Sequence, residues 1–251
     1  MIENNKKLLT WIGISIFVLG AITASIYQGL LLWGHLEDTQ FDTSDPALMV
    51  EERLRTLQCP RIITLDEVTT VSAAFTNPTD SSRIRIVRTN ISEGFVSLRR
   101  ELITNLTLSP GETQRLEWEV SSDDAVWGRF IFVRVHVLRT SAQLPAQSAT
   151  CNILVLNLSG VSGSLIANLW LALSLLGPVL GVGMWSRPRW PLIEDDKKRF
   201  FKMGLIVLFL WAGLYFSMAG YWILHLVVLV FLIFILLGMM TSFIVSSPEL
   251  M

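Results

Sequence analysis

The sequence predicts a membrane protein with four transmembrane α-helices and one extracytoplasmic antiparallel β-sandwich. Three observations carry this prediction. Hydrophobic residues make up 51% of the 251 residues and charged residues only 16%, whereas soluble domains carry about 25% charge. Long apolar stretches lie towards both ends of the chain. Between them, apolar and polar residues alternate with a period of two, which is typical of strands.

Four apolar stretches are long enough to cross the hydrocarbon core, which takes about 20 residues of helix. Their backbone groups would find no water there, so each is expected to be helical. The predicted organisation begins with a cytoplasmic N-terminus and first transmembrane helix in residues 1–33, a linker in 34–56 and a β-sandwich in 57–160. A second transmembrane helix follows in 161–185 and a basic cytoplasmic loop in 186–202. A third helix is predicted in 203–219, and a fourth helix with a short cytoplasmic tail in 220–251.

The first apolar stretch has an alternative interpretation as a cleaved signal peptide, because Lys6 and Lys7 precede it. Signal h-regions have about 7–15 residues, and this stretch continues well beyond that length. An uncleaved anchor is therefore the favoured interpretation.

Basic residues in short loops predict which side of the membrane the loops occupy, because such residues stay on the cytoplasmic side. The N-terminus and the loop at 186–202 are both basic and are separated by two predicted spans, which places both inside and the β-sandwich outside the plasma membrane. We expect the loop residues to anchor this topology and to contact anionic lipid headgroups. They are Arg187, Arg189, Lys197, Lys198, Arg199 and Lys202.

The stretch from Gly34 to Gly160 contains the predicted strands. Twelve arginines, no lysine and sixteen acidic residues give it a net charge of -4, and the lack of a basic face argues against a nucleic-acid partner. The segments "QCPRIIT", "TTVSAAFTNPTD", "SSRIRIVRT", "SPGETQRLEWEVS", "RFIFVRVHVL" and "TCNILVLNL" mark out about seven short strands. In the third segment, Ile84 and Ile86 alternate against Arg83 and Arg85.

The two cysteines of the chain lie near the two ends of this stretch. Cys59 is on the first predicted strand and Cys151 on the last, both in a compartment that favours oxidation. We expect a disulfide between them; the alternative is two separate buried thiols.

The run "LTLSPGETQRLEWEV", followed by "GRFIFVRVHV", resembles the strand–turn–strand pattern of bacterial immunoglobulin-like domains of the CARDB and NEW3 type. The resemblance covers about forty residues. It implies an immunoglobulin-like sandwich and a role in adhesion, spacing or assembly.

The linker before the sandwich is predicted to contain a short amphipathic helix. Asp45 and Pro46 form a helix start, and Val50, Leu54 and Leu57 then fall on one face.

Candidate sites outside the membrane are few. On the outward face of one predicted strand, apolar rings stand where water is expected, which suggests a partner-binding patch. Its residues are Phe130, Phe132, Arg134 and His136. Glu117 and Glu119 are interpreted as a solvated strand face. No motif indicates a catalytic residue, a metal or a cofactor.

Within the membrane, small residues at a spacing of four predict close helix packing, either between two spans of this chain or against a partner. Gly177, Gly181 and Gly183 form such a face in the second span, and Ala21, Ser25 and Gly29 a similar stripe in the first. His225 is interpreted as a structural residue or as one that faces the lipid headgroups at the interface.

These features favour a non-catalytic accessory, assembly or adhesion subunit whose sandwich binds a protein or envelope polymer. The alternatives are a component of a membrane transport or energy-coupling complex, and an envelope enzyme that acts on polysaccharide.

Overall fold

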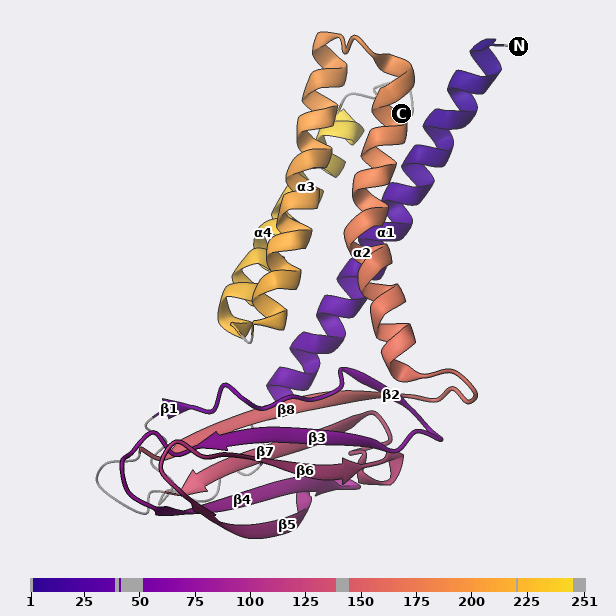
Figure 1. Ribbon diagram of the computed structural model, residues 1–251. Helices are drawn as coiled ribbons and strands as arrows, with labels where there is room; N and C mark the ends of the chain where they lie inside the picture. Colours follow the sequence, from indigo (N-terminus) through magenta and orange to yellow (C-terminus); the bar gives the residue numbers. More distant parts are fainter. Residues whose placement is uncertain (1, 39–40, 42–51, 139–144, 220, 246–251) are drawn as a thin grey trace. The chain divides into compact units, whose positions relative to one another are not determined.

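The computed structural model describes residues 2–38, 41, 52–138, 145–219 and 221–245 (Figure 1). The chain forms two compact units. The sheet unit is Trp33–Ala167, and the helical unit consists of Met1–Leu32 and Asn168–Met251.

The sheet unit contains two β-sheets. Its strands are β1 (Glu52–Arg53), β2 (Ile62–Thr64), β3 (Thr69–Thr76), β4 (Arg83–Glu93), β5 (Phe95–Leu108), β6 (Thr113–Val120), β7 (Phe130–Leu138) and β8 (Gln147–Leu156), with a 3₁₀ turn, η1 (Ser122–Asp124), after β6. One sheet has the order β1-β8-β7-β4-β5, with β2 also paired to β8, and the other consists of β3 and β6. Because β1 and β2 both run parallel to β8, the larger sheet is mixed, and the expected purely antiparallel arrangement is wrong at this edge.

The parallel pairs arise because residues 52–64 run along the edge of β8. The segment pairs with the start of β8 at β1 and with its end at β2. Between the two, Gln58 bridges to Ser72 of the other sheet. The first predicted strand, residues 58–64, therefore consists of a single bridge at Gln58, which pairs with the smaller sheet, and the short strand β2, which pairs with the larger one.

The two sheets pack face to face around one apolar core. The inward side chains alternate along each strand, as the pleat requires, and include Val71 from β3, Trp118 from β6, and Ile131 and Val133 from β7. On β3, β6 and β7 these are the faces that the sequence pattern indicates.

Strand β4 is oriented opposite to the predicted pattern. Arg85, Val87 and Ile91 face the core, and Ile84 is 56% exposed. The partner strand β5 has no counterpart among the predicted segments, although its register with β4 extends from Leu108 back to Arg99. The apolar residues at the centre of β4 therefore determine which of its side chains face the core, and the two isoleucines at its start do not.

The predicted linker helix lies in part outside the described residues, which do not include 42–51. Beyond that gap, Glu52–Arg53 form strand β1 and Leu54 is buried in the core of the sheet unit. A helix that continues to Leu57 is thus wrong, because these residues pair with β8 instead.

Four helices account for the other apolar stretches: α1 (Ile2–Asp38), α2 (Gly163–Ser186), α3 (Glu194–Met218) and α4 (Trp222–Val245), with a 3₁₀ turn, η2 (Arg187–Arg189), after α2. Among the described residues, three helical stretches are long and apolar enough to cross a membrane, Asn5–Gly34, Gly163–Arg189 and Glu194–Met218. The corresponding stretch of α4, Ile223–Ile235, is shorter. Within the described residues, the predicted count of four spans is therefore not supported.

Helix α3 begins nine residues before the predicted third span. Glu194, Asp195 and Asp196 occupy its first turn, where negative side chains interact favourably with the helix dipole. The second half of the predicted loop at 186–202 is thus helical, and its lysines lie on α3.

Candidate functional site

A cavity of about 770 Å³ opens at one end of the sheet unit. It lies where β1, the end of β3 and the starts of β4 and β8 come together. Its lining residues are Glu52, Arg53, Leu54, Arg55, Thr56, Ala74, Phe75, Thr76, Pro78, Arg85, Pro145 and Gln147. Three arginines and one glutamate make the lining net positive.

Arg85 is the buried member of this lining. It shares the inward face of β4 with Val87 and Ile91, and only 5% of its surface is exposed. Among the described residues, no group accepts a hydrogen bond from its Nε. Burial lowers the pKa of the guanidinium, and the nearby carboxylate of Glu52 partly opposes this. The charged form of Arg85 is therefore incompletely compensated within the described chain.

The other charged groups of the cavity lie nearer to solvent. Arg53 and Arg55 are exposed, and the carboxylate of Glu52 accepts a hydrogen bond from Nε2 of Gln147 at 3.1 Å. Guanidinium groups bind carboxylates and phosphates through paired N–H donors. The arrangement is thus suited to an anion. The sequence pattern missed it because the alternation set Arg85 opposite to Ile84 and Ile86, away from the apolar phase.

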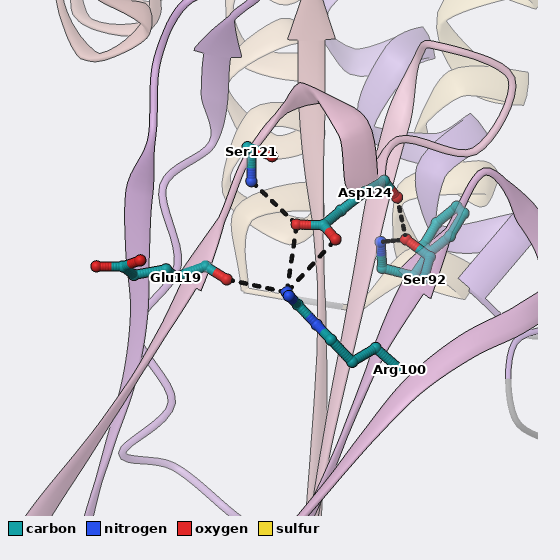
Figure 2. Close-up of polar contacts among 6 residues, drawn as sticks. Ser92, Arg100, Glu119, Ser121 and Asp124 are labelled. Atoms are coloured by element: carbon teal, nitrogen blue, oxygen red, sulfur yellow. Dashed lines mark hydrogen bonds and ion pairs between the residues drawn. The ribbon is translucent and has the colours of Figure 1, made fainter.

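A second polar cluster surrounds Asp124 (Figure 2). Nη2 of Arg100 lies 3.4 Å from Oδ1 of Asp124 and donates to the backbone carbonyl of Glu119 at 3.1 Å. The backbone N–H of Ser121 donates to Asp124 Oδ2 at 3.0 Å, and Oγ of Ser92 donates to the Asp124 carbonyl at 2.8 Å. Asp124 thus joins η1 to β4 through Ser92 and to β5 through Arg100, and Arg100 also joins β5 to β6, so the cluster is a structural clamp.

The predicted acidic face on β6 has no catalytic geometry in this cluster. In Figure 2 the carboxylate of Glu119 points away from Arg100, which contacts only its backbone carbonyl. Glu117 is exposed and pairs with Arg115 at 3.3 Å. Both side chains fit the interpretation of a solvated strand face.

The predicted partner patch is not exposed, and this expectation is wrong. Phe130 and Phe132 are 4% and 0% exposed, and His136 is buried as well. Phe41 and Val126 cover the two rings, and the rings of Phe41 and Phe132 lie 5.8 Å apart. The apolar residues on this outer face of β7 form a second small core. Arg134, the fourth predicted member, is half-buried.

The two cysteines are joined by a disulfide, with Sγ atoms 2.01 Å apart. Cys59 lies between the two segments that pair with β8, and Cys151 lies on β8 between their partners. The disulfide therefore ties down the edge segment at the point where it leaves the larger sheet.

The glycines of α2 differ in what surrounds them. A Cβ on Gly181 would lie 2.5 Å from the backbone N of Phe17 in α1, and one on Gly177 would lie 3.0 Å from Cα of Gly20. Gly183 has nothing within 4 Å, so it takes no part in packing within the described chain, and the alternative of a partner contact stays a prediction.

The contact face of α1 also differs from the predicted stripe. Ala24 is fully buried, whereas Ser25 is exposed and Gly29 faces open space; Ala21 packs at the margin. The small residues that allow close approach are Gly13 and Gly20. They lie on a different face of α1 from the predicted stripe.

Arg189 differs from the other basic residues of the predicted anchor because it is engaged within the helical unit. Its Nη1 donates to the carbonyl of Trp185 at 2.9 Å and to Oγ1 of Thr10 at 3.2 Å. Its guanidinium stacks over the Trp185 ring at 4.4 Å and lies 3.7 Å from Asp196. With Lys6, Lys7 and Trp11, Arg189 also lines a hollow of about 380 Å³.

The remaining predicted anchor residues lie at the surface. Their positions are outside the core of the helical unit, on η2 or the first turns of α3: Arg187, Lys197, Lys198, Arg199 and Lys202.

Polar side chains are buried inside the helical unit. His225 is fully buried, which fits the structural interpretation and not the one in which it faces headgroups. Gln28 of α1 is 2% exposed and donates from Nε2 to the carbonyl of Leu210 in α3 at 2.9 Å. Such side-chain hydrogen bonds join helices in an apolar surrounding.

No known protein family and no curated protein matches the chain. Among solved structures, it is similar to a β-glucosidase from Listeria innocua in complex with glucose (14% identity, TM-score 0.29, 40% of this chain and 15% of that one). It is similar to a CARDB domain from Pyrococcus furiosus in complex with di-metal ions (10% identity, TM-score 0.31, 41% of this chain and 90% of that one). A Bacteroides uniformis β-glucuronidase is a third neighbour (11% identity, TM-score 0.29, 39% and 12%). The chain thus spans less than one sixth of either glycosidase, and a CARDB domain does occur among its neighbours.

Proposed function

We propose that this protein is a non-catalytic integral membrane subunit that displays its sheet unit outside the plasma membrane to bind a partner protein. The observation that carries the proposal is the division of the chain into two units of different chemistry. The sheet unit has its own apolar core and a disulfide, whereas the helical unit has helices apolar enough to cross a bilayer.

The proposed topology has four spans, with α4 as the fourth, and both termini in the cytoplasm. The basic residues support this orientation, because Lys6 and Lys7 precede α1 and the basic segment at 186–202 lies two spans later. The sheet unit then faces an oxidising compartment, where disulfides form and persist.

The proposed lipid contacts lie on the cytoplasmic side. Lys6, Lys7 and Arg189 border one hollow together with Trp11. Basic side chains near an anionic membrane surface each contribute about 1 kcal/mol, and tryptophan rings prefer the interface. This hollow is thus a suitable place for an anionic headgroup.

Two experiments test the proposal on the full-length protein. Affinity purification of the tagged chain in mild detergent should retain a stable partner protein; a solitary monodisperse monomer would contradict the function. A membrane-impermeant thiol reagent applied to intact cells should label Asp80→Cys, in the sheet unit, and leave Lys198→Cys unlabelled. The reverse pattern would overturn the topology.

A second candidate function is favoured by the buried polar residues of the helical unit. His225 and Gln28 are buried at positions where an apolar residue would have a lower free-energy cost of burial. Polar groups within spans often mark transport pathways or coupling sites. A role in a transport or energy-coupling complex predicts that His225→Ala abolishes the pH response of the purified complex. An unchanged pH response and normal assembly would exclude it.

A further inference from the structure

The cavity at the end of the sheet unit contains a feature that the fold does not require. Arg85 occupies an inward position on β4, where Val87 and Ile91, on the same face, are apolar. A buried charge is strongly destabilising unless it is paired. Within the described residues, its Nε has no hydrogen-bond partner. A bound anion would supply the missing acceptor.

The dimensions and the charge of the cavity agree with a ligand site. Its volume of about 770 Å³ lies in the usual range of roughly 300–1,000 Å³ for such sites. Arg53 and Arg55 add positive charge at the opening, and Glu52, whose carboxylate accepts a hydrogen bond from Gln147 and partly compensates Arg85, supplies one negative charge against the three arginines. The net positive lining therefore selects for a negative group.

The remaining lining indicates what accompanies the anion. Leu54, Ala74, Phe75, Pro78 and Pro145 contribute apolar surface beside the arginines. A phosphate-bearing polyol polymer offers only single CH and CH2 groups between its oxygens to such a surface, and no apolar side chain. An acidic side chain next to an apolar residue in a peptide offers both.

We propose that this cavity binds an acidic peptide segment of a partner protein, with Arg85 and Arg55 donating to its carboxylate and the apolar lining contacting the adjoining residue. The inference rests on the proposed function in one respect, because it identifies the surface through which the displayed sheet unit holds its partner.

The test uses the full-length protein in detergent micelles and isothermal titration calorimetry. The probe is a capped hexapeptide, Gly-Val-Asp-Val-Asp-Gly, and the matched probe has Asn in place of both Asp residues. The acidic peptide should bind, and the Asn peptide should bind at least about tenfold more weakly, because charge-assisted hydrogen bonds are lost. Equal binding of the two peptides, or no binding of the acidic one, overturns the inference.

Variants then locate the site. Arg85→Met keeps an unbranched apolar stem without the guanidinium charge and should weaken binding at least about tenfold. Arg55→Gln changes an exposed residue, so it tests the cavity even where Arg85→Met does not fold, and it should weaken binding by about threefold or more. Arg61→Gln, an exposed arginine outside the lining, is the matched control and should bind as the wild type. Unchanged binding in Arg55→Gln and Arg85→Met overturns the inference.

Two further arms separate this inference from its alternatives. If poly(glycerol phosphate) binds more tightly than the acidic peptide and depends on Arg55, the occupant is an envelope polymer and the peptide assignment fails. If the partner captured in detergent is retained equally by Arg55→Gln, the cavity inference fails while the proposed function stands. If the acidic peptide binds through Arg55 to a chain that captures no partner, the proposed function fails and the cavity remains a peptide site.

Discussion

The sheet unit and the helical unit use the same kinds of side chain in opposite ways. In the sheet unit, large apolar residues such as Ile63, Val71 and Ile131 are fully buried. In the helical unit, residues of similar size face outward, with Leu169 at 61%, Leu208 at 60% and Phe234 at 66% exposure. Burial of apolar surface from water stabilises the first unit. It contributes little to the second if lipid is the surrounding medium, because lipid tails are as apolar as the side chains.

The helices of the helical unit instead make close backbone contacts with one another. Gly177 of α2 faces Gly20 of α1, and Gly181 faces Phe17. In the proposed membrane location, dispersion contacts of this kind would replace the hydrophobic effect as the source of stability. The sheet unit instead relies on large side chains and on one covalent link. The two units should therefore respond to different substitutions.

The largest expected effect in the sheet unit comes from removing the disulfide. A link between residues 92 positions apart contributes about 4–5 kcal/mol in the chain-entropy treatment. In Cys59→Ala/Cys151→Ala, hydrogen exchange of the full-length protein should speed up in peptides of the sheet unit and stay unchanged in those of the helical unit. Equal acceleration in both units would contradict the separation of their stability, and reductant should have no added effect on the double variant.

Loss of an aromatic ring from the outer face of β7 comes next. Phe132→Ala removes a ring that is fully buried against Phe41, and the expected loss is about 3–5 kcal/mol of unfolding free energy. Phe95→Ala, at a position 58% exposed, should stay within about 0.5 kcal/mol of the wild type. Denaturant titration followed by fluorescence measures both. A small effect of Phe132→Ala would mean that this face of β7 is open, as the sequence pattern had suggested.

The smallest effect concerns the helical unit. Gly181→Ala places a Cβ 2.5 Å from the backbone of Phe17, and the strain should cost about 1–3 kcal/mol. Gly183→Ala, two residues along the same helix and without neighbours, should instead be neutral or stabilising by up to about 1 kcal/mol, since alanine favours the helix. Thermal unfolding in detergent gives the order of the two Tm values. The reverse order would remove α1–α2 contact as the basis of packing.

The core-facing side of a strand could be predicted from the sequence wherever only one of the two alternating sets of residues is apolar. On β6, Trp118 and Val120 alternate with charged residues, and the structure buries that phase. On β4, Ile84 and Ile86 compete with Val87 and Ile91, which belong to the opposite phase. The choice depends on the partner strands, and β4 lies between β5 and β7 with its central residues over the core. The sequence did not indicate the cavity around Arg85, because it did not show which phase of β4 faces inward.

The sequence alone determined that long apolar helices flank a strand-rich segment and that its two cysteines stand near opposite ends of that segment, because composition and periodicity are local properties. The tertiary structure decided which phase of β4 faces inward, which glycines touch another helix and what covers Phe132. Each of these depends on residues far away in the chain: pairing with β5 and β7, the approach of α1 to α2, and the contact with Phe41. A pattern along one segment carries no information about such neighbours.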